Sequence, residues 1–190
     1  MTTAAGRTAQ AAFVLAAIGA MAVFATTAKD GETRRAPDNL VRYLNASYTG
    51  ENRTAPDFDL TDRNGRHVHL RDYRGKTVVL HFWTRTCGPC VEELQTAIPA
   101  FDEIVKARPD IALLMVTVDS DWNAIAPLIP RNFNAPILFD PRRQVVTSSY
   151  GTRLFPETWV IDREGVIRAR FDHTIEWDSP LFIDYLATLR

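Results

Sequence analysis

The 190-residue sequence predicts an α/β fold in which helices cover both faces of one mixed sheet. A nearly continuous apolar run, TVVLHFW (77–83), suits a strand that is buried on both faces. Apolar residues then recur close to helical spacing from 90 to 106, and a second apolar run follows, IALLMVTVD (111–119). Strand, helix and strand in this order predict a right-handed parallel crossover at the centre of the sheet. Hairpin signals at both ends of the domain predict that the sheet is mixed.

The first hairpin is expected just after Ala55-Pro56, where the globular part of the chain begins. The segments FDLTD (58–62) and HVHL (67–70) alternate between apolar and polar residues around Asn64-Gly65. Asn-Gly between two alternating segments is a strong hairpin signal. The sequence therefore predicts an extra N-terminal β-hairpin before the central strand.

The remaining elements follow from the same kinds of signal. In order, they are a helix over 122–128, a strand over 135–140, a helix over 141–150 closed by Gly151, a hairpin of 157–162 and 166–171 joined by Arg163-Glu164-Gly165, and a helix over 179–189 capped by Asp178 or Ser179. Ligands of such folds bind at the carboxyl ends of the central strands, and both cysteines of the chain follow one such end.

The N-terminal segment has the pattern of an export signal. No charged residue occurs between Arg7 and Lys29, and Ala11–Ala25 is unbroken apolar sequence. This fits a signal peptide, but residues 8–28 would also be long enough to span a bilayer core of about 30 Å. Of these two, we expect a retained anchor. An amphipathic helix packed on the domain is disfavoured, because this segment is apolar all round and has no polar face to show solvent.

Three regions are therefore predicted. Residues 1–28 form a signal peptide or membrane anchor, the polar stretch 29–54 is a linker, and 55–190 is the folded domain. The domain is expected outside the cytoplasm, in the periplasm, held at the inner membrane by its N-terminal segment.

Composition places the function in a local site. With 22 basic and 23 acidic residues the net charge is -1, so no overall field attracts nucleic acid. Disulfides are common in exported proteins, but a structural disulfide usually closes a long loop. A disulfide between two cysteines separated by two residues closes almost no loop in the unfolded chain, which favours a chemical role for the pair.

The motif Cys87-Gly88-Pro89-Cys90 lies where a buried strand meets a helix. Pro89 suits the first helical turn, where a missing N–H removes no intrahelical bond. The helix N-terminus favours an anion, so the pKa of Cys87 is expected below that of free cysteine. We therefore predict Cys87 as the nucleophile and Cys90 as the shielded resolving thiol.

Other readings of the motif are an inert disulfide, two buried thiols or a zinc site. Zinc would need further ligands, and the sequence has no second CxxC and no HxxxH motif, so no metal site is predicted. The only redox group expected is the Cys87–Cys90 disulfide, with no other cofactor.

The domain resembles the exported TlpA/ResA-type thiol-disulfide oxidoreductases of the thioredoxin superfamily over nearly all of 55–190. The segments that carry the resemblance are APDFDLTDRNGRHVHLRDYRGKTVVLHFW, CGPCVEEL, VTVD and YGTRLFPETWVIDREGVIRARF. The resemblance implies a thioredoxin-like fold, protein-disulfide oxidoreductase activity and protein thiols or disulfides as substrates. It also implies a membrane electron donor and a setting such as cytochrome c maturation.

The resemblance also implies further site residues. It predicts a cis peptide at Pro156, with the backbone of Phe155 pairing with the substrate chain, and it assigns Trp83 to the substrate-binding region. Glu93 shares a helix face with Cys90 and corresponds to a carboxylate below the cysteines in the family. A buried carboxyl there would relay the proton of Cys90, while Glu92 would be solvated.

The sequence departs from the family near the first cysteine. Thr86 replaces a common Trp, and Arg85 before it should lower the pKa of Cys87. Glu93 should raise it, with a larger effect per contact because a buried charge is not screened by salt, and the net redox potential is left open. Gln95 replaces a frequent proline, which predicts a straighter active-site helix.

The histidines are assigned no role. His67 and His69 share a hairpin face and could hold a metal, but solvated strand residues are the better interpretation. His81 is expected as a satisfied polar group of the core, and His173 in a loop.

Two alternative functions remain. A peroxidase is disfavoured, because peroxiredoxins have Pro and Thr or Ser at set positions before the reactive cysteine, and the seventh residue before Cys87 is Leu80. A thioredoxin-fold module that binds a soft metal through the CxxC is the second alternative.

Overall fold

The computed structural model describes residues 43–44, 46–48 and 53–189. They belong to one compact unit, Leu40–Arg190. The predicted signal or anchor segment and most of the predicted linker lie outside the described residues. Within the described residues, no helix has the length and apolar character needed to cross a membrane.

The described residues form one mixed sheet of eight strands in the order β1-β8-β7-β4-β5-β6-β2-β3. The strands are β1 (Arg53–Thr54), β2 (Asp59–Asp62), β3 (His67–His69), β4 (Thr77–Trp83), β5 (Ile111–Thr117), β6 (Ile137–Phe139), β7 (Glu157–Ile161) and β8 (Val166–Phe171). β4, β5 and β6 are parallel, and the other pairs are antiparallel. The predicted parallel crossover is confirmed.

Strand β4 lies in the middle because its residues suit burial on both faces. Every residue of β4 is buried, and the strand pairs with β5 on one side and β7 on the other. Successive side chains point to opposite faces, so Val79 and Trp83 enter one core cluster while Val78 and Leu80 enter the other. The carboxyl end of β4 leads directly to the cysteines.

Strands β2 and β3 pair antiparallel, with Leu60 opposite Val68. Gly65 in the turn has φ 74°, a left-handed conformation that glycine adopts without steric cost. β2 also pairs with β6, so the two strands extend one edge of the sheet.

The opposite edge includes residues from the predicted linker. Arg53 and Thr54 form β1 against β8, and the N–H of Ser47 donates to the carbonyl oxygen of Arg170 at 2.8 Å. The part of the linker that the structure describes therefore lies along β8.

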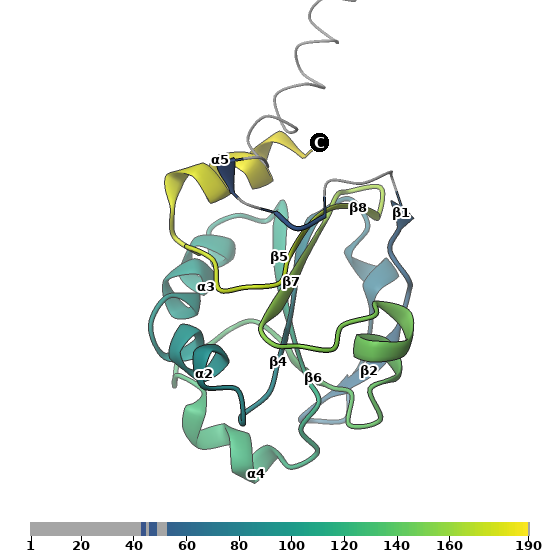
Figure 1. Cartoon of the computed structure of the whole chain (residues 1–190), viewed down its shortest axis with the longest axis vertical. Coiled ribbons are helices and arrows are strands. Elements are labelled where there is room, and N and C mark those ends of the chain that lie inside the picture. The colour runs from purple at the N-terminus through teal and green to yellow at the C-terminus, as the bar shows by residue number, and fades with distance from the viewer. Residues whose placement is uncertain (1–42, 45, 49–52, 190) are drawn as a thin grey trace, which may run out of the picture. The chain divides into compact units, whose positions relative to one another are not determined.

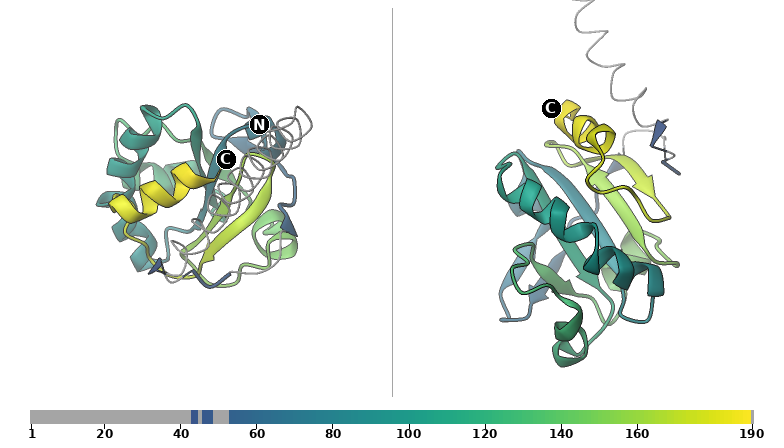
Figure 2. Two further views of the ribbon diagram at one scale, coloured as in Figure 1. Left: turned by 90° about the horizontal axis from the view of Figure 1, so that it is seen from above. Right: turned by 90° about the vertical axis from the view of Figure 1, so that its left-hand side faces the viewer.

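Helices cover both faces, as Figure 1 shows, with α2 and α3 on one side of the sheet and the green turns of η3 on the other. Figure 2 shows α5 on the same side as α2 and α3. The helices are η1 (Leu70–Tyr73), α2 (Gly88–Gln95), α3 (Ile98–Lys106), α4 (Trp122–Ile125), η2 (Ala126–Leu128), η3 (Gln144–Ser149) and α5 (Pro180–Thr188). Ser179 caps α5, one of the two caps predicted.

The prediction of one continuous helix over 90–106 is wrong. The chain breaks between α2 and α3 at Thr96-Ala97. Pro99 lacks an N–H and its ring would clash with the carbonyl of residue 95, so it belongs in the first turn of a new helix. Gln95, which stands where relatives often have proline, is the last residue of α2.

In place of the helix predicted over 141–150, the structure has a shorter π-helical segment, η3. The buried carboxylate of Asp140 starts it by accepting the N–H groups of Gln144, Val145 and Val146 at 3.0, 2.9 and 2.8 Å.

Candidate active site

The two cysteines form a disulfide at the start of α2, with their Cα atoms 5.3 Å apart. Cys87 is the N-cap residue, Pro89 lies in the first turn, and the backbone N–H of Cys90 donates to the sulfur of Cys87 at 3.2 Å. The strand-to-helix junction therefore holds the Cys87 sulfur beside free N–H groups, which stabilise a thiolate.

The two sulfurs differ in access. Cys90 is 1% exposed, whereas Cys87 is half-buried and reaches the surface. Cys90 packs in the same core cluster as Trp83 and Leu94. An external sulfur can therefore reach Cys87 much more readily than Cys90.

Arg85 does not face Cys87 as an isolated cation. Its Nε lies 3.4 Å from Oδ1 of Asp119, and its backbone N–H donates to Oδ2 of Asp119 at 2.9 Å. Thr117 donates its hydroxyl to the same carboxylate at 2.7 Å. Part of the positive charge expected to lower the pKa of Cys87 is thus offset by Asp119.

Asp119 is a site residue that was not predicted from the sequence, although a signal for it is present. Asp119 follows β5, the parallel neighbour of β4, and the carboxyl ends of parallel strands meet at one edge. Its position directly after the apolar sequence of β5 therefore indicates that Asp119 lies near the cysteines, which follow β4.

Glu93 lies in the interior, 6% exposed, while Glu92 is exposed. Oε1 of Glu93 accepts two hydrogen bonds, from the indole N–H of Trp177 at 2.8 Å and from the backbone N–H of Ile175 at 3.1 Å. Oε2 has no partner among the described residues. Burial raises the pKa of Glu93, and the two N–H donors offset part of that rise.

Trp177 is the other residue that the sequence analysis missed. Its side chain is fully buried, with its ring centroid 5.4 Å from that of Phe101 and 5.0 Å from that of His81. Trp177 stands in a polar stretch with no periodic pattern, so no local signal connects it to Glu93.

His81 is a buried polar residue as expected, but only half of its ring is satisfied. Nδ1 lies 2.9 Å from the hydroxyl of Thr158, and Nε2 has no partner in the part of the chain that the structure describes. Burial lowers the pKa of His81 to about 3, so the ring is neutral at physiological pH.

The hairpin histidines share one carboxylate. Nδ1 of His67 lies 2.7 Å from Oδ1 of Asp59, and Nε2 of His69 lies 4.0 Å from Oδ2. Among the residues described, no three or more potential ligands are grouped as a metal would require.

The Phe155-Pro156 peptide bond is cis, which confirms that prediction. Phe155 is half-buried, and its neighbour Leu154 is 79% exposed. Trp83, assigned to the substrate-binding region, is fully buried in the disulfide form, so its side chain offers no surface to a protein substrate in this state.

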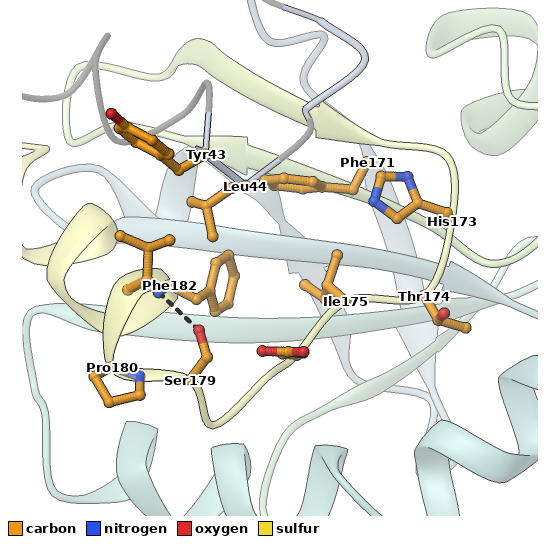
Figure 3. A pocket seen from close by; sticks show the side chains of 11 residues that line it. Tyr43, Leu44, Phe171, His173, Thr174, Ile175, Ser179, Pro180 and Phe182 are labelled. Carbon is orange, nitrogen blue, oxygen red and sulfur yellow. Dashed lines mark hydrogen bonds between the residues drawn. The ribbon is translucent and has the colours of Figure 1, made fainter.

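A cleft of about 600 Å³ lies beside α5, and neither cysteine lines it. Figure 3 shows Leu44, Phe171 and Phe182 on its walls, with the hydroxyl of Ser179 accepting the N–H of Phe182. No predicted site residue lines it. Its lining includes Ile175, whose N–H donates a hydrogen bond to Glu93. The cleft therefore borders the segment that positions the Glu93 carboxyl.

Residues 52–170 match the model of the AhpC/TSA family, more than half of the chain. The chain belongs to the AhpC/TSA family. Within it, this member is similar to the thiol-disulfide oxidoreductase ResA of Geobacillus thermodenitrificans, 35% identical over 118 residues that cover 60% of this chain and 65% of that protein. It is also similar to the thioredoxin-like protein YneN of Bacillus subtilis, 32% identical over 62% of this chain and 69% of that protein.

This family member thus spans slightly less than two thirds of the ResA proteins it matches. Two solved structures confirm the thioredoxin-like fold. A putative thiol:disulfide interchange protein DsbE from Chlorobium tepidum superposes with a TM-score of 0.60 at 26% identity, covering 75% of this chain and all of that one. The pneumococcal exposed lipoprotein thioredoxin Etrx1 gives 0.59 at 30% identity, covering 70% and 100%. The predicted relation to ResA-type members of the thioredoxin superfamily is confirmed, and the names of these relatives agree with the predicted class of enzyme.

Proposed function

We propose that this protein is a thiol-disulfide oxidoreductase that reduces disulfides of other proteins. The observation that carries this proposal is the pairing of Cys87, a half-buried N-cap residue that reaches the surface, with the buried Cys90 in one disulfide. The names of the ResA and DsbE relatives support it.

The reduced enzyme begins the reaction as a Cys87 thiolate. The thiolate attacks one sulfur of the target disulfide, forms a mixed disulfide with it, and releases the other target sulfur as a thiolate that takes up a proton. Cys90 then loses its proton and attacks the Cys87 sulfur. The Cys87–Cys90 disulfide re-forms, and the second target sulfur leaves as a thiolate. The target gains two electrons, and the enzyme is oxidised by two.

The start of α2 favours the first step. The N–H of Cys90 points at the Cys87 sulfur in the disulfide, and the same donor would stabilise the thiolate after reduction.

Glu93 serves the second step by accepting the proton of Cys90. Both N–H donors contact Oε1, so Oε2 is the oxygen free to carry a proton. Burial raises the pKa of Glu93, which makes the carboxyl a better proton acceptor than a solvated glutamate. Once neutral, it no longer opposes the thiolates above it.

The substrate chain lies along Phe155 and Pro156 and pairs with the backbone of Phe155. Trp83 supports this region from the core, where it packs in the same cluster as Cys90. The resemblance to the ResA proteins supports these roles.

The setting that fits best is extracytoplasmic. Residues 1–28 would direct export or anchor the chain at the inner membrane through 8–28, 29–54 would link the anchor to the domain over 55–190, and a membrane donor would return electrons to the disulfide. The apolar N-terminal sequence supports this, as does the description of the pneumococcal relative as an exposed lipoprotein. Cytochrome c maturation is the pathway we propose.

Trapping tests the proposal and the order of the cysteines. Cys90→Ala should accumulate mixed disulfides between Cys87 and substrate proteins, because Cys87 still attacks but nothing resolves the intermediate. Non-reducing electrophoresis with mass spectrometry measures these adducts. Cys87→Ala is the matched control and should trap few, since Cys90 is 1% exposed. More adducts with Cys87→Ala would show that the roles are reversed.

The same preparation separates the alternatives. The reduced wild-type protein should reduce insulin disulfides. Faster turnover with hydrogen peroxide than with insulin would favour the peroxidase. Stoichiometric copper retention without disulfide exchange would favour the metal-binding module.

A further inference from the structure

The segment that leads to Phe155 and Pro156, which we call the substrate loop, carries a concentrated positive charge. Residues 141–156, PRRQVVTSSYGTRLFP, contain three arginines and no acidic residue, although the whole chain has a net charge of -1. We call Arg142, Arg143 and Arg153 the arginine patch. All three side chains are exposed.

These arginines differ from most others in the domain. Many arginines are paired with carboxylates, for example Arg71 with Asp57 at 2.6 Å and Arg170 with Glu157 at 2.6 Å. Among the described residues, no carboxylate pairs with an arginine of the patch. The patch therefore presents uncompensated charge to a partner.

Arg143 links the patch to the substrate loop. Its guanidinium carbon lies 5.7 Å from the ring centroid of Phe155, the residue proposed to pair with the substrate chain. Arg143 has φ 55°, the one positive φ at a non-glycine residue in the described part of the chain. Such backbone conformations are uncommon outside glycine and concentrate at functional sites.

Arg153 and Leu154 directly precede Phe155 in the chain and so lie near it. Two residues of extended chain span at most about 7 Å, so Arg153 cannot be far from Phe155. Leu154 is 79% exposed and is one of two large hydrophobic residues that are exposed among those described, the other being Tyr43. An apolar side chain beside unpaired arginines offers both contact area and charge to a bound peptide.

We propose that the arginine patch, with Leu154 and Phe155, selects protein substrates whose disulfide lies in an extended segment rich in aspartate and glutamate. This inference rests on the proposed disulfide exchange and specifies its substrate class. The substrate backbone would pair at Phe155, an apolar residue would contact Leu154, and flanking carboxylates would meet Arg143 and Arg153. Since the charges are exposed, they would act mainly on the rate of association and would be screened by salt.

The test uses three peptides that share one disulfide and differ only in whether the flanking residues are acidic, neutral or basic, together with the small neutral hydroxyethyl disulfide. For the reduced wild-type enzyme at low ionic strength, we expect kcat/KM for the acidic peptide to exceed that for the basic peptide about tenfold. Near 1 M salt, where the Debye length is about 3 Å, the ratio should approach one.

Charge reversal localises the effect. Arg143→Glu and Arg153→Glu should each lower the acidic-to-basic ratio several-fold, and the double variant should invert it. Lys106→Glu is the control. Lys106 is the last residue of α3, which leads to the amino end of β5, whereas the disulfide follows the carboxyl end of the neighbouring parallel strand β4. It should keep the wild-type ratio and should reduce hydroxyethyl disulfide at the wild-type rate. For each reversal variant, the peptide rates are divided by its own rate with hydroxyethyl disulfide, which carries no charge.

Equal rates for the acidic and basic peptides at low salt would overturn the proposal, and so would a ratio that both reversals leave unchanged. If hydroxyethyl disulfide and every peptide were left unreduced, the proposed function itself would fail and this inference with it. Reduction of hydroxyethyl disulfide without charge preference would reject the inference alone.

Discussion

The indole N–H of Trp177 donates a 2.8 Å hydrogen bond to Oε1 of Glu93, across 84 positions of sequence. The backbone N–H of Ile175 donates to the same oxygen. This arrangement distinguishes the two carboxyl oxygens, because Oε1 accepts both hydrogen bonds while Oε2 is buried without a partner among the described residues. Trp177 is therefore a positioning residue for the carboxyl that we propose moves the proton of Cys90.

Trp177→Phe should raise the pKa of Glu93 further. The substitution removes a donor that favours the charged carboxylate and leaves the burial that disfavours it. A ¹³C NMR titration of the Glu93 carboxyl in the oxidised protein measures this shift. Phe182→Leu is the matched control, since Phe182 packs against Trp177 but does not contact Glu93 through a hydrogen bond. A similar shift in both variants would mean that Trp177 acts only through packing.

Glu93 should make the oxidised protein less stable as the pH rises above 4.5. Burial raises its pKa in the folded state above the ordinary value of 4.5, so the folded protein keeps a proton that the unfolded chain has lost. The contribution of Glu93 to the free energy of unfolding is full below pH 4.5 and is lost as the pH passes through the folded pKa.

Urea unfolding of Glu93→Gln over a pH series tests this. The variant cannot ionise at this position, so its free energy of unfolding should lack the fall that the wild type shows. The exposed Glu92→Gln should retain it. Parallel curves for wild type and Glu93→Gln would contradict a buried, raised carboxyl.

His81 should act in the opposite direction. Its pKa is lowered to about 3 in the folded state against an ordinary value of 6.5, so the unfolded chain binds the proton first as the pH falls. Stability from this residue is full above pH 6.5 and falls by about 1.4 kcal/mol per pH unit towards pH 3.

The double variant His81→Phe/Thr158→Val removes this acid-side loss. It replaces both partners of the 2.9 Å hydrogen bond, which avoids leaving one buried polar group unpaired. Below pH 6.5 its stability should therefore decline less than that of the wild type, as measured by thermal unfolding. Thr158→Val alone keeps the imidazole and should keep the decline. If the double variant declines as steeply as the wild type, another group causes the acid-side loss.

Asp119→Asn should increase the thiolate fraction of Cys87 in the reduced enzyme. The change removes the negative charge that lies 3.4 Å from the guanidinium of Arg85, so the Arg85 charge would act on the thiolate without that offset. The pH dependence of iodoacetamide alkylation should shift to lower pH, and less so at high salt because Arg85 is exposed. Arg85→Gln should shift it the other way. No shift in either variant would mean that neither charge reaches Cys87.

Much of the fold could be predicted because its signals are local. The apolar run of β4, the alternation on either side of Asn64-Gly65 and the hairpin at Gly165 lie within a few residues of the structure they form. The break between α2 and α3 was missed because the apolar pattern continues through it. Pro99 interrupts the helix despite that pattern, because it has no N–H to continue the helical hydrogen bonds.

The sequence by itself determined the reactive pair, since Cys87-Gly88-Pro89-Cys90 follows a buried strand and opens a helix within one short segment. Only the tertiary structure decided what surrounds the pair. Trp177 reaches Glu93, Asp119 offsets Arg85, and Arg143 lies over Phe155. These contacts join residues from different elements, and their side chains meet only after the sheet and its helices pack together, so no periodicity along the chain could reveal them.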